Sequence, residues 1–115
     1  MSDRKSLLLL VKSSGLGEGE VDLADKLIKS FFTVLLQEEQ RPDRMIFINS
    51  GIFLTTEGSP VADILKQFVE SGTEVFSCGT CLDYYGRKEQ LVVGEAGDMK
   101  GTVVSLLEFE KVITL

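Results

Sequence analysis

The sequence predicts an α/β fold, a three-layer α/β/α sandwich in which a mainly parallel sheet of about five strands lies between helices. Three observations support this prediction. Short apolar runs alternate along the chain with longer segments whose apolar residues recur every three or four positions. Turns that contain glycine or proline separate these segments. The 115 residues, 43% of them hydrophobic, fit a single domain over residues 1–115.

The first half of the chain supplies two strands and one helix. Residues 6–12 form a continuous apolar run between polar residues, which is typical of a buried parallel strand. Residues 21–37 have the apolar spacing of an amphipathic helix, and Arg41-Pro42-Asp43 ends it before a second strand at 44–49. The apolar stripe of this helix is wider than contact with one sheet needs. Two explanations of the extra apolar width remain open: self-association of the chain through this helix, or deeper burial of the helix in a small core.

The second half continues the alternation. Ser59-Pro60 predicts a helix start, because serine caps a first turn and proline is tolerated just after it, and Ser71-Gly72 predicts the end of that helix. The same patterns predict the remaining elements: a strand at 73–77, a short helix at 79–85 closed by Gly86, a fourth strand at 90–93, a helix capped by Asp98 that carries Met99, Val103, Leu106 and Leu107, and a last strand at 111–115.

Charge and hydropathy restrict the classes of partner. Twelve basic and 18 acidic residues give a net charge of −6, so the chain repels polyanions, and we expect neither nucleic acid nor acidic membranes as partners. The longest apolar run is far shorter than the roughly 20 residues of a membrane-spanning helix. The few residues that precede it include one Lys and one Arg, and no small-residue cleavage site follows. We therefore expect a cytoplasmic protein.

The most informative motif is Cys78-Gly79-Thr80-Cys81, which contains both cysteines of a chain that has no histidine. It follows the third predicted strand directly and opens a short helix. Cys78 is thus predicted at the helix N-cap, where free N–H groups and the helix dipole stabilise a thiolate. Gly79 lets the backbone approach a bound sulfur without a side chain in the way. The sequence indicates that sulfur carries the chemistry of this protein.

Several chemistries fit such a pair. The two cysteines could be small hydrophobes in a buried loop. Zinc normally takes four ligands, and without histidine these two could hold it only by sharing a site between subunits, so we expect no metal and no other cofactor. A dithiol exchange centre uses the same spacing at a helix start, although usually after the first strand of its fold. A persulfide carrier needs only one accessible thiolate, which matches Cys78.

Other loops are predicted at the same edge of the sheet as the cysteines, because the carboxyl ends of parallel strands gather there and form the ligand crevice. The glycine-rich loop 15–19 completes neither the dinucleotide fingerprint nor a phosphate loop, so we interpret it as a flexible rim. By position alone, the candidate substrate-binding residues are Ser13, Ser14, Asn49, Gly51, Gly79 and Thr80.

The order of four blocks carries a resemblance that extends over nearly the whole chain. The blocks are Ser13-Ser14 with the glycines after them, Asn49-Ser50-Gly51, Thr56-Glu57-Gly58-Ser59, and Cys78-Gly79-Thr80-Cys81-Leu82-Asp83-Tyr84-Tyr85-Gly86 with Val93-Gly94-Glu95. In this order they resemble the DsrE/DsrF-like sulfurtransferase family, and within it the DsrE-like domain of YedF-type proteins, linked by name to selenium metabolism.

The resemblance implies a function and a set of partners. In the family a cysteine after the third strand carries sulfur as a persulfide, which implies Cys78 as the carrier and Cys81 as its resolving or alternative partner. YedF-type proteins commonly contain an upstream TusA-like domain, whereas this sequence begins at the DsrE-like strand, so a TusA-like donor or acceptor could be a separate protein. The family often forms trimers or hexamers, which implies a homo-oligomer here.

The leading hypothesis is therefore a cytoplasmic, sulfurtransferase-like carrier of sulfane sulfur or selenium that acts through Cys78. Two alternatives remain open: a non-catalytic, oligomeric interaction subunit, and a dithiol redox protein that uses Cys78 and Cys81. The exposure of the two sulfurs decides which cysteine is the carrier. If Cys78 is buried and Cys81 is open, Cys81 becomes the carrier and Cys78 its partner.

Overall fold

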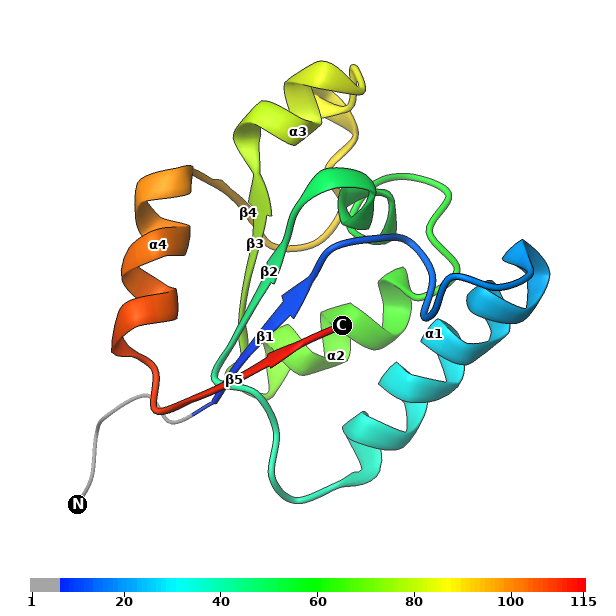
Figure 1. Cartoon of the computed structure of the whole chain (residues 1–115), viewed down its shortest axis with the longest axis horizontal. Helices are drawn as coiled ribbons and strands as arrows, with labels where there is room; N and C mark the ends of the chain where they lie inside the picture. The colour runs from blue at the N-terminus through cyan, green and yellow to red at the C-terminus, as the bar shows by residue number, and fades with distance from the viewer. Residues whose placement is uncertain (1–6) are drawn as a thin grey trace.

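The computed structural model describes residues 7–115 as one five-stranded sheet with helices around it (Figure 1). The strand order is β4-β3-β2-β1-β5, and all neighbouring strands are parallel. This confirms the predicted fold class. The elements are β1 (Leu7–Val11), α1 (Val21–Gln37), β2 (Arg44–Phe47), the 3₁₀ helix η1 (Asn49–Leu54), α2 (Ala62–Glu70), β3 (Glu74–Cys78), α3 (Gly79–Tyr84), the 3₁₀ helix η2 (Lys88–Gln90), β4 (Glu95–Gly97), α4 (Met99–Glu108) and β5 (Lys111–Thr114).

Helices α1 and α2 cover one face of the sheet and enclose the larger part of the core. Side chains that alternate along the strands point to opposite faces, so Met45 and Phe47 of β2 meet Phe32 of α1 and Phe68 of α2 on this side. The predicted bounds of α1 are confirmed. For the first strand, the expected Ser6 lies outside the described residues.

The opposite face is covered by α4, which is on the other side of the sheet from α1 in Figure 1. The apolar cluster on this face is small and contains Leu8, Leu10, Ile46 and Phe109. The buried residues of α4 are Thr102 and Ser105, while the apolar residues that the sequence places on this helix, Met99, Val103, Leu106 and Leu107, are all exposed. This orientation of α4 has a physical reason, because Ser105 on its inward face accepts a hydrogen bond from Arg44 of β2.

The fourth strand is not at residues 90–93, as the sequence predicted, but at Glu95–Gly97. Gly94, which has a φ of 76°, explains the difference. A Cβ atom at Gly94 would lie 2.4 Å from the carbonyl oxygen of Val75, so the chain turns tightly against β3 at this point. It can pair with β3 only after the turn, and the preceding Leu91 makes an isolated antiparallel bridge with Thr56 instead.

The carboxyl ends of β1, β2 and β3 lie at one edge of the sheet, as the parallel register requires. The segment after β2, expected as a loop, is the 3₁₀ helix η1, and α3 begins directly where β3 ends. Helix α3 stands at this edge rather than on either face (Figure 1). Across residues 7–115, no helix has the length and apolar character needed to cross a membrane.

Candidate functional site

Cys78 lies where β3 ends and α3 begins, and it is the N-cap of α3. Its sulfur accepts a hydrogen bond of 3.3 Å from the backbone N–H of Cys81. The preceding Ser77 fixes the end of the strand, since its hydroxyl lies 2.6 Å from that of the buried Thr55. Only 6% of Cys78 is exposed. The predicted N-cap position is confirmed, and the site offers an anionic sulfur one backbone donor at the positive end of a helical turn.

Cys81 lies one turn further along α3 and is half-buried. Its sulfur accepts a hydrogen bond of 3.0 Å from the backbone N–H of Asn49, the first residue of η1. Asn49 has a φ of 52°, a left-handed conformation that asparagine tolerates better than most residues. Both cysteines are free thiols, and each accepts a hydrogen bond from a backbone N–H.

The protonation of Cys81 is shifted by its surroundings. Burial raises the pKa of the Cys81 thiol, because desolvation disfavours the thiolate, and a hydrogen bond with the Cys78 sulfur raises it further. The N–H of Asn49 acts in the opposite direction and does not outweigh these causes. Cys81 therefore holds its proton to a higher pH than an ordinary cysteine does, next to a sulfur that accepts hydrogen bonds.

Cys81 opens into a recess of about 400 Å³, which we call the Cys81 recess and define by Asn49, Thr80, Cys81, Tyr84 and Tyr85. The Tyr84 side chain is 82% exposed and makes an edge-to-face contact with the ring of Tyr85, at 5.2 Å between centroids. The hydroxyl of Tyr85 is 3.4 Å from Oδ1 of Asn49. Two tyrosines thus form an aromatic rim beside the half-buried sulfur.

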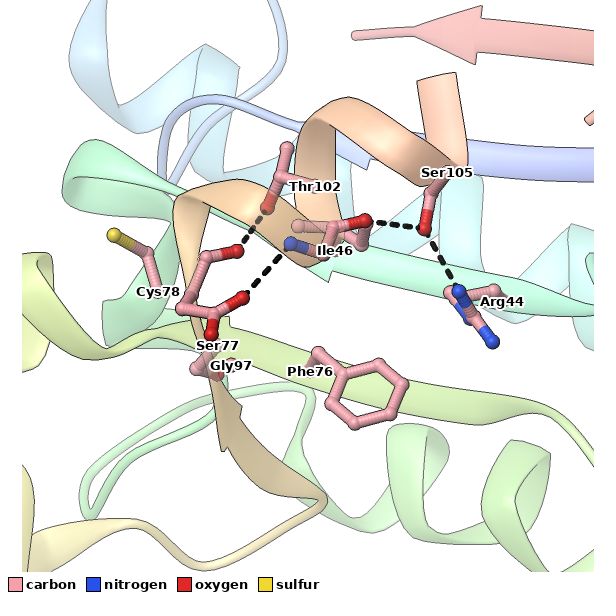
Figure 2. A pocket seen from close by; sticks show the side chains of 10 residues that line it. Arg44, Ile46, Phe76, Ser77, Cys78, Gly97, Thr102 and Ser105 are labelled. Atoms are coloured by element: carbon pink, nitrogen blue, oxygen red, sulfur yellow. Dashed lines mark hydrogen bonds between the residues drawn. The ribbon is translucent and has the colours of Figure 1, made fainter. Parts of the chain in front are cut away.

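Cys78 lines a different and smaller pocket of about 150 Å³ between β2, β3, the end of β4 and the first turns of α4 (Figure 2). Figure 2 shows Cys78 at one end of its lining and Arg44 at the other. We call it the Cys78 pocket; its lining is Arg44, Ile46, Phe76, Ser77, Cys78, Gly97, Asp98, Gly101, Thr102 and Ser105.

The polar side chains of the Cys78 pocket are engaged with the protein itself. Nε and Nη2 of Arg44 donate to Oε1 of Glu74 at 2.9 and 2.8 Å, and Nη1 donates to the hydroxyl of Ser105 at 2.7 Å. Oδ1 of Asp98 accepts the N–H of Gly101, and the hydroxyl of Thr102 donates to the Asp98 carbonyl. The pocket therefore offers a ligand mainly apolar walls, and Figure 2 shows the Cys78 sulfur pointing away from the other side chains of the lining.

Three of the predicted site residues, Asn49, Gly79 and Thr80, lie beside the cysteines, and Gly51 does not. Asn49 and Thr80 line the Cys81 recess, and Gly79 lies so near the carbonyl oxygen of Gly97 that a Cβ atom would be 3.1 Å from it. Gly51 is buried, and a Cβ atom there would lie 2.6 Å from the carbonyl oxygen of Val11. The absence of a side chain at Gly51 therefore allows η1 to pack closely against the end of β1.

The predicted serines of the first loop do not join the cysteines. The hydroxyl of Ser13 is engaged within its own loop by Gly15. Ser14 lines a separate pocket with Phe53, Lys26, Lys29 and Arg87. Neither serine lines the Cys78 pocket or the Cys81 recess.

The contribution of α4 and β2 to the pocket of Cys78 does not follow from the sequence predictions. In the sequence Arg44 is only a strand residue, and Thr102 and Ser105 lie among apolar residues. Their signal was present as small polar residues three apart on a helix, a spacing that places them on one face. Only the position of α4 reveals that this face meets the end of β3.

The site can perform thiol chemistry with two inequivalent sulfurs. Within residues 7–115 we find no group of three or more histidine, cysteine or acidic side chains arranged to hold a metal ion. The sulfur of Cys78 is capped by a helix N–H, and the thiol of Cys81 retains its proton next to it. Such a pair can accept a sulfur atom, transfer it, or form a disulfide.

No protein-family model and no curated protein matches the sequence. Solved structures do match. The YchN protein of E. coli aligns with a TM-score of 0.70 and 18% identity, over 96% of this chain and 99% of YchN. A protein of unknown function from Methanobacterium thermoautotrophicum gives 0.69 and 11%, covering 96% and 99% of the two chains. Another from Bacteroides thetaiotaomicron gives 0.64 and 12%, covering 96% and 95%. At these identities the likeness shows the fold alone, an α/β/α sandwich around a parallel sheet, as predicted.

Proposed function

We propose that this protein is a carrier of sulfane sulfur that holds the atom as a cysteine persulfide on the Cys78–Cys81 pair. One observation carries the proposal: two free thiols lie at the start of α3, and a backbone N–H points at each sulfur. Such donors stabilise a thiolate and also the terminal sulfur anion of a persulfide. The DsrE-like fold is compatible with a role in sulfur relay.

The transfer is an exchange without net oxidation. A thiolate of the pair attacks the outer sulfur of a donor persulfide, R–S–SH, so that one S–S bond forms and one breaks. The products are a protein persulfide and the donor thiolate, R–S⁻. The reverse step passes the sulfur to an acceptor thiolate, and neither direction needs a cofactor or an oxidant.

The two cysteines have different roles in this proposal. Cys78 is the carrier, since it accepts the N–H of Cys81 at the helix N-cap. Cys81 retains its proton to higher pH and is the partner thiol. Exposure alone favours the reversed roles, because Cys78 is buried, whereas Cys81 is half-buried rather than fully open. We therefore propose that exposure decides only which sulfur the donor meets first. Sulfur therefore meets the pair most readily at Cys81 and is held at Cys78.

Mass spectrometry tests the function directly. After incubation with inorganic polysulfide, we expect the wild-type protein to gain the mass of one sulfur atom, removable by dithiothreitol and located at Cys78 by fragmentation. The doubly substituted Cys78→Ser, Cys81→Ser protein should gain nothing. Absence of the adduct in the wild type, or the same adduct in the double variant, would contradict the proposal.

The dithiol alternative is supported by one contact, the hydrogen bond of 3.3 Å from the backbone N–H of Cys81 to the Cys78 sulfur, which keeps the two cysteines together at the start of α3. A redox protein would form a reversible Cys78–Cys81 disulfide, seen as the loss of two hydrogen atoms on titration with a glutathione buffer. If this change occurs at cytosolic potentials and no persulfide accumulates, the redox function replaces the carrier function.

Partners follow from the proposed chemistry. A carrier exchanges sulfur with thiols of other molecules, among them a TusA-like protein, and a selenium donor would be handled by the same exchange. We propose a cytoplasmic location, because free thiols persist in a reducing compartment. The alternative of an interaction subunit without activity predicts no adduct and unchanged partner binding when both cysteines become serine.

A further inference from the structure

We propose that the side chains of Asn49 and Tyr85 are positioning groups, which hold the backbone N–H of Asn49 against the Cys81 sulfur so that this donor is in place whenever the sulfur is charged. The purpose of such positioning rests on the proposed carrier function, because a cysteine sulfur is an anion each time it receives or releases a sulfur atom. Any residue at position 49 other than proline could supply a backbone N–H, so what is specific to this chain is the pair of side chains that hold it.

The backbone conformation of Asn49 is unusual for a residue with a side chain. Within residues 7–115 it is the only residue other than glycine that has a positive φ, at 52°. Such a conformation is unfavourable for L-residues and persists only where the surrounding structure holds it, which occurs most often at functional sites. The N–H of this same residue donates to the Cys81 sulfur at 3.0 Å. The strained residue is therefore the one that contacts a thiol of the candidate site.

Two hydrogen bonds hold the side chain of Asn49. Its Oδ1 accepts the backbone N–H of Ser50 at 2.9 Å, which closes the amide over its own turn. The same oxygen accepts the hydroxyl of Tyr85 at 3.4 Å, which ties it to the end of α3. Since Cys81 is also on α3, Asn49 is bound to that helix twice, by its N–H at the sulfur and by its side chain at the tyrosine. A donor held in this way does not have to move as charge develops on the sulfur.

The ring of Tyr85 is fixed by contacts of its own. It packs on the ring of Phe53, at 4.7 Å between centroids, and the guanidinium of Arg87 lies 4.8 Å from the centroid of the Phe53 ring. Arg87 also donates to the carbonyl of Glu57 at 2.9 Å. Because Asn49 and Phe53 belong to the same short helix η1, Tyr85 contacts η1 at two places. These contacts keep the hydroxyl where Asn49 accepts it.

Tyr84 provides a comparison within the same recess. It lines the Cys81 recess as Tyr85 does, but its side chain is 82% exposed and its hydroxyl makes no hydrogen bond with the described residues. The other titratable group nearby is Cys78 at the start of the same helix, and among residues 7–115 no acidic or basic side chain lines the recess. The two tyrosines thus differ in their bond to Asn49 and share their charge surroundings.

The first test is the pH dependence of iodoacetamide alkylation at Cys81, measured by peptide mass spectrometry, because only the thiolate reacts. Tyr85→Phe keeps the ring and removes the hydroxyl. It should raise the pH of half-maximal alkylation by about half a unit, since an N–H that is held less firmly stabilises the thiolate less. Tyr84→Phe makes the same change on the neighbouring ring and should leave this midpoint at the wild-type value.

Two variants at position 49 separate positioning from a merely structural role. Asn49→Ala and Asn49→Gly both delete the amide, but glycine adopts a positive φ freely and alanine does not. Asn49→Ala should therefore raise the Cys81 midpoint by about one unit, and Asn49→Gly should raise it less. A merely structural role lowers the urea midpoint of these variants and leaves the pH midpoint unchanged. If Asn49→Ala does not fold, Tyr85→Phe decides, because it removes a single oxygen from an exposed side chain.

Sulfur loading is measured separately, with inorganic polysulfide as the donor near neutral pH. Asn49→Ala should load about threefold more slowly than the wild type, because a higher pKa leaves less thiolate but makes each thiolate more nucleophilic. Tyr84→Phe should load at the wild-type rate. Unshifted pH midpoints in Tyr85→Phe and Asn49→Ala, or an equal shift in Tyr84→Phe, would overturn the positioning role and leave the carrier function standing. A wild type that never loads, with the midpoints shifted as expected, would overturn the carrier function instead.

Discussion

At the scale of the residue, the two cysteines differ because of what surrounds each sulfur. Cys78 ends a central strand and is covered by α4, whereas Cys81 is one helical turn away and faces the recess beside η1. Asn49 acts on Cys81 through its backbone: it has a left-handed conformation, and its N–H donates a hydrogen bond to the Cys81 sulfur. Two identical side chains three residues apart thus acquire different exposure and different protonation.

The raised pKa of Cys81 leads to a prediction about pH. We expect the alkylation of Cys81 by iodoacetamide to reach half its maximal rate at a higher pH than that of an ordinary cysteine, because only the thiolate reacts. Peptide mass spectrometry against pH measures this. Cys78→Ala should lower the midpoint, since it removes the hydrogen bond that contributes to the shift. A wild-type midpoint at or below the ordinary value would contradict the assignment.

The same shift affects stability with a definite sign. A folded-state pKa above the unfolded value means that folding favours the neutral thiol. The stability that this group contributes is fully present below the unfolded pKa and is lost as pH rises through the folded pKa. Alkaline conditions should therefore destabilise the wild type more than Cys81→Ser.

At the scale of the element, α4 is held to the sheet by polar contacts more than by apolar burial. The Arg44 guanidinium joins Glu74 of β3 to Ser105 of α4 and lies over the rings of Phe76 and Phe109, at 5.4 and 5.3 Å from their centroids. Arginine suits this position because its planar fork can donate in several directions while its face stacks on aromatic rings.

Arg44→Lys tests this anchoring. Lysine keeps the charge but cannot bind Glu74 and Ser105 together while stacking on both rings, so we expect the free energy of unfolding to fall by about 1 kcal/mol. The figure is small because the side chains of Arg44 and Glu74 are 24% and 40% exposed, and solvent screens the pair. Urea denaturation measures the change, with the exposed Lys100→Arg on α4 as control. An unchanged midpoint for Arg44→Lys would show that α4 does not depend on this contact.

At the scale of the whole molecule, apolar side chains are exposed on helices that lie on opposite faces of the sheet (Figure 1). On α1 they include Leu23, Leu27 and Val34, as the wide stripe in the sequence suggested. On α4 they include Met99, Val103 and Leu107, the last at 79% exposure. Two different apolar faces on one chain favour head-to-tail contacts, which close into rings.

We therefore expect a homo-oligomer when the mass of the purified protein is measured by light scattering, and the resemblance in sequence implies a trimer or a hexamer. Leu107→Glu and Leu27→Glu each place a charge on one of the two faces, and at least one of them should lower the mass, because a buried unpaired charge is costly. Val69→Glu on α2, at 40% exposure, is the control. A wild-type monomer at high concentration would contradict the expectation.

Much of the fold could be predicted from local patterns. The bounds of α1 and the strand-to-helix junction at Cys78 follow from periodicity and capping, which depend on neighbours in sequence. The fourth strand could not be placed, because residues 90–93 look more strand-like than Glu95–Gly97, and the left-handed turn at Gly94 decides between them through its contact with Val75. The candidate site was predicted as a cysteine pair, without the pocket that α4 builds over Cys78.

The sequence alone determined the fold class, the edge of the sheet where the cysteines lie and the cap of α3, because these depend on short-range spacing and on the geometry of parallel strands. Only the tertiary structure decided which sulfur is covered and which face of α4 is buried. Both depend on contacts between segments far apart in the chain, such as Arg44 with Ser105 and Asn49 with Cys81. The two cysteines are a pair in the sequence, and the packing of α4 and η1 around them makes the two sulfurs different.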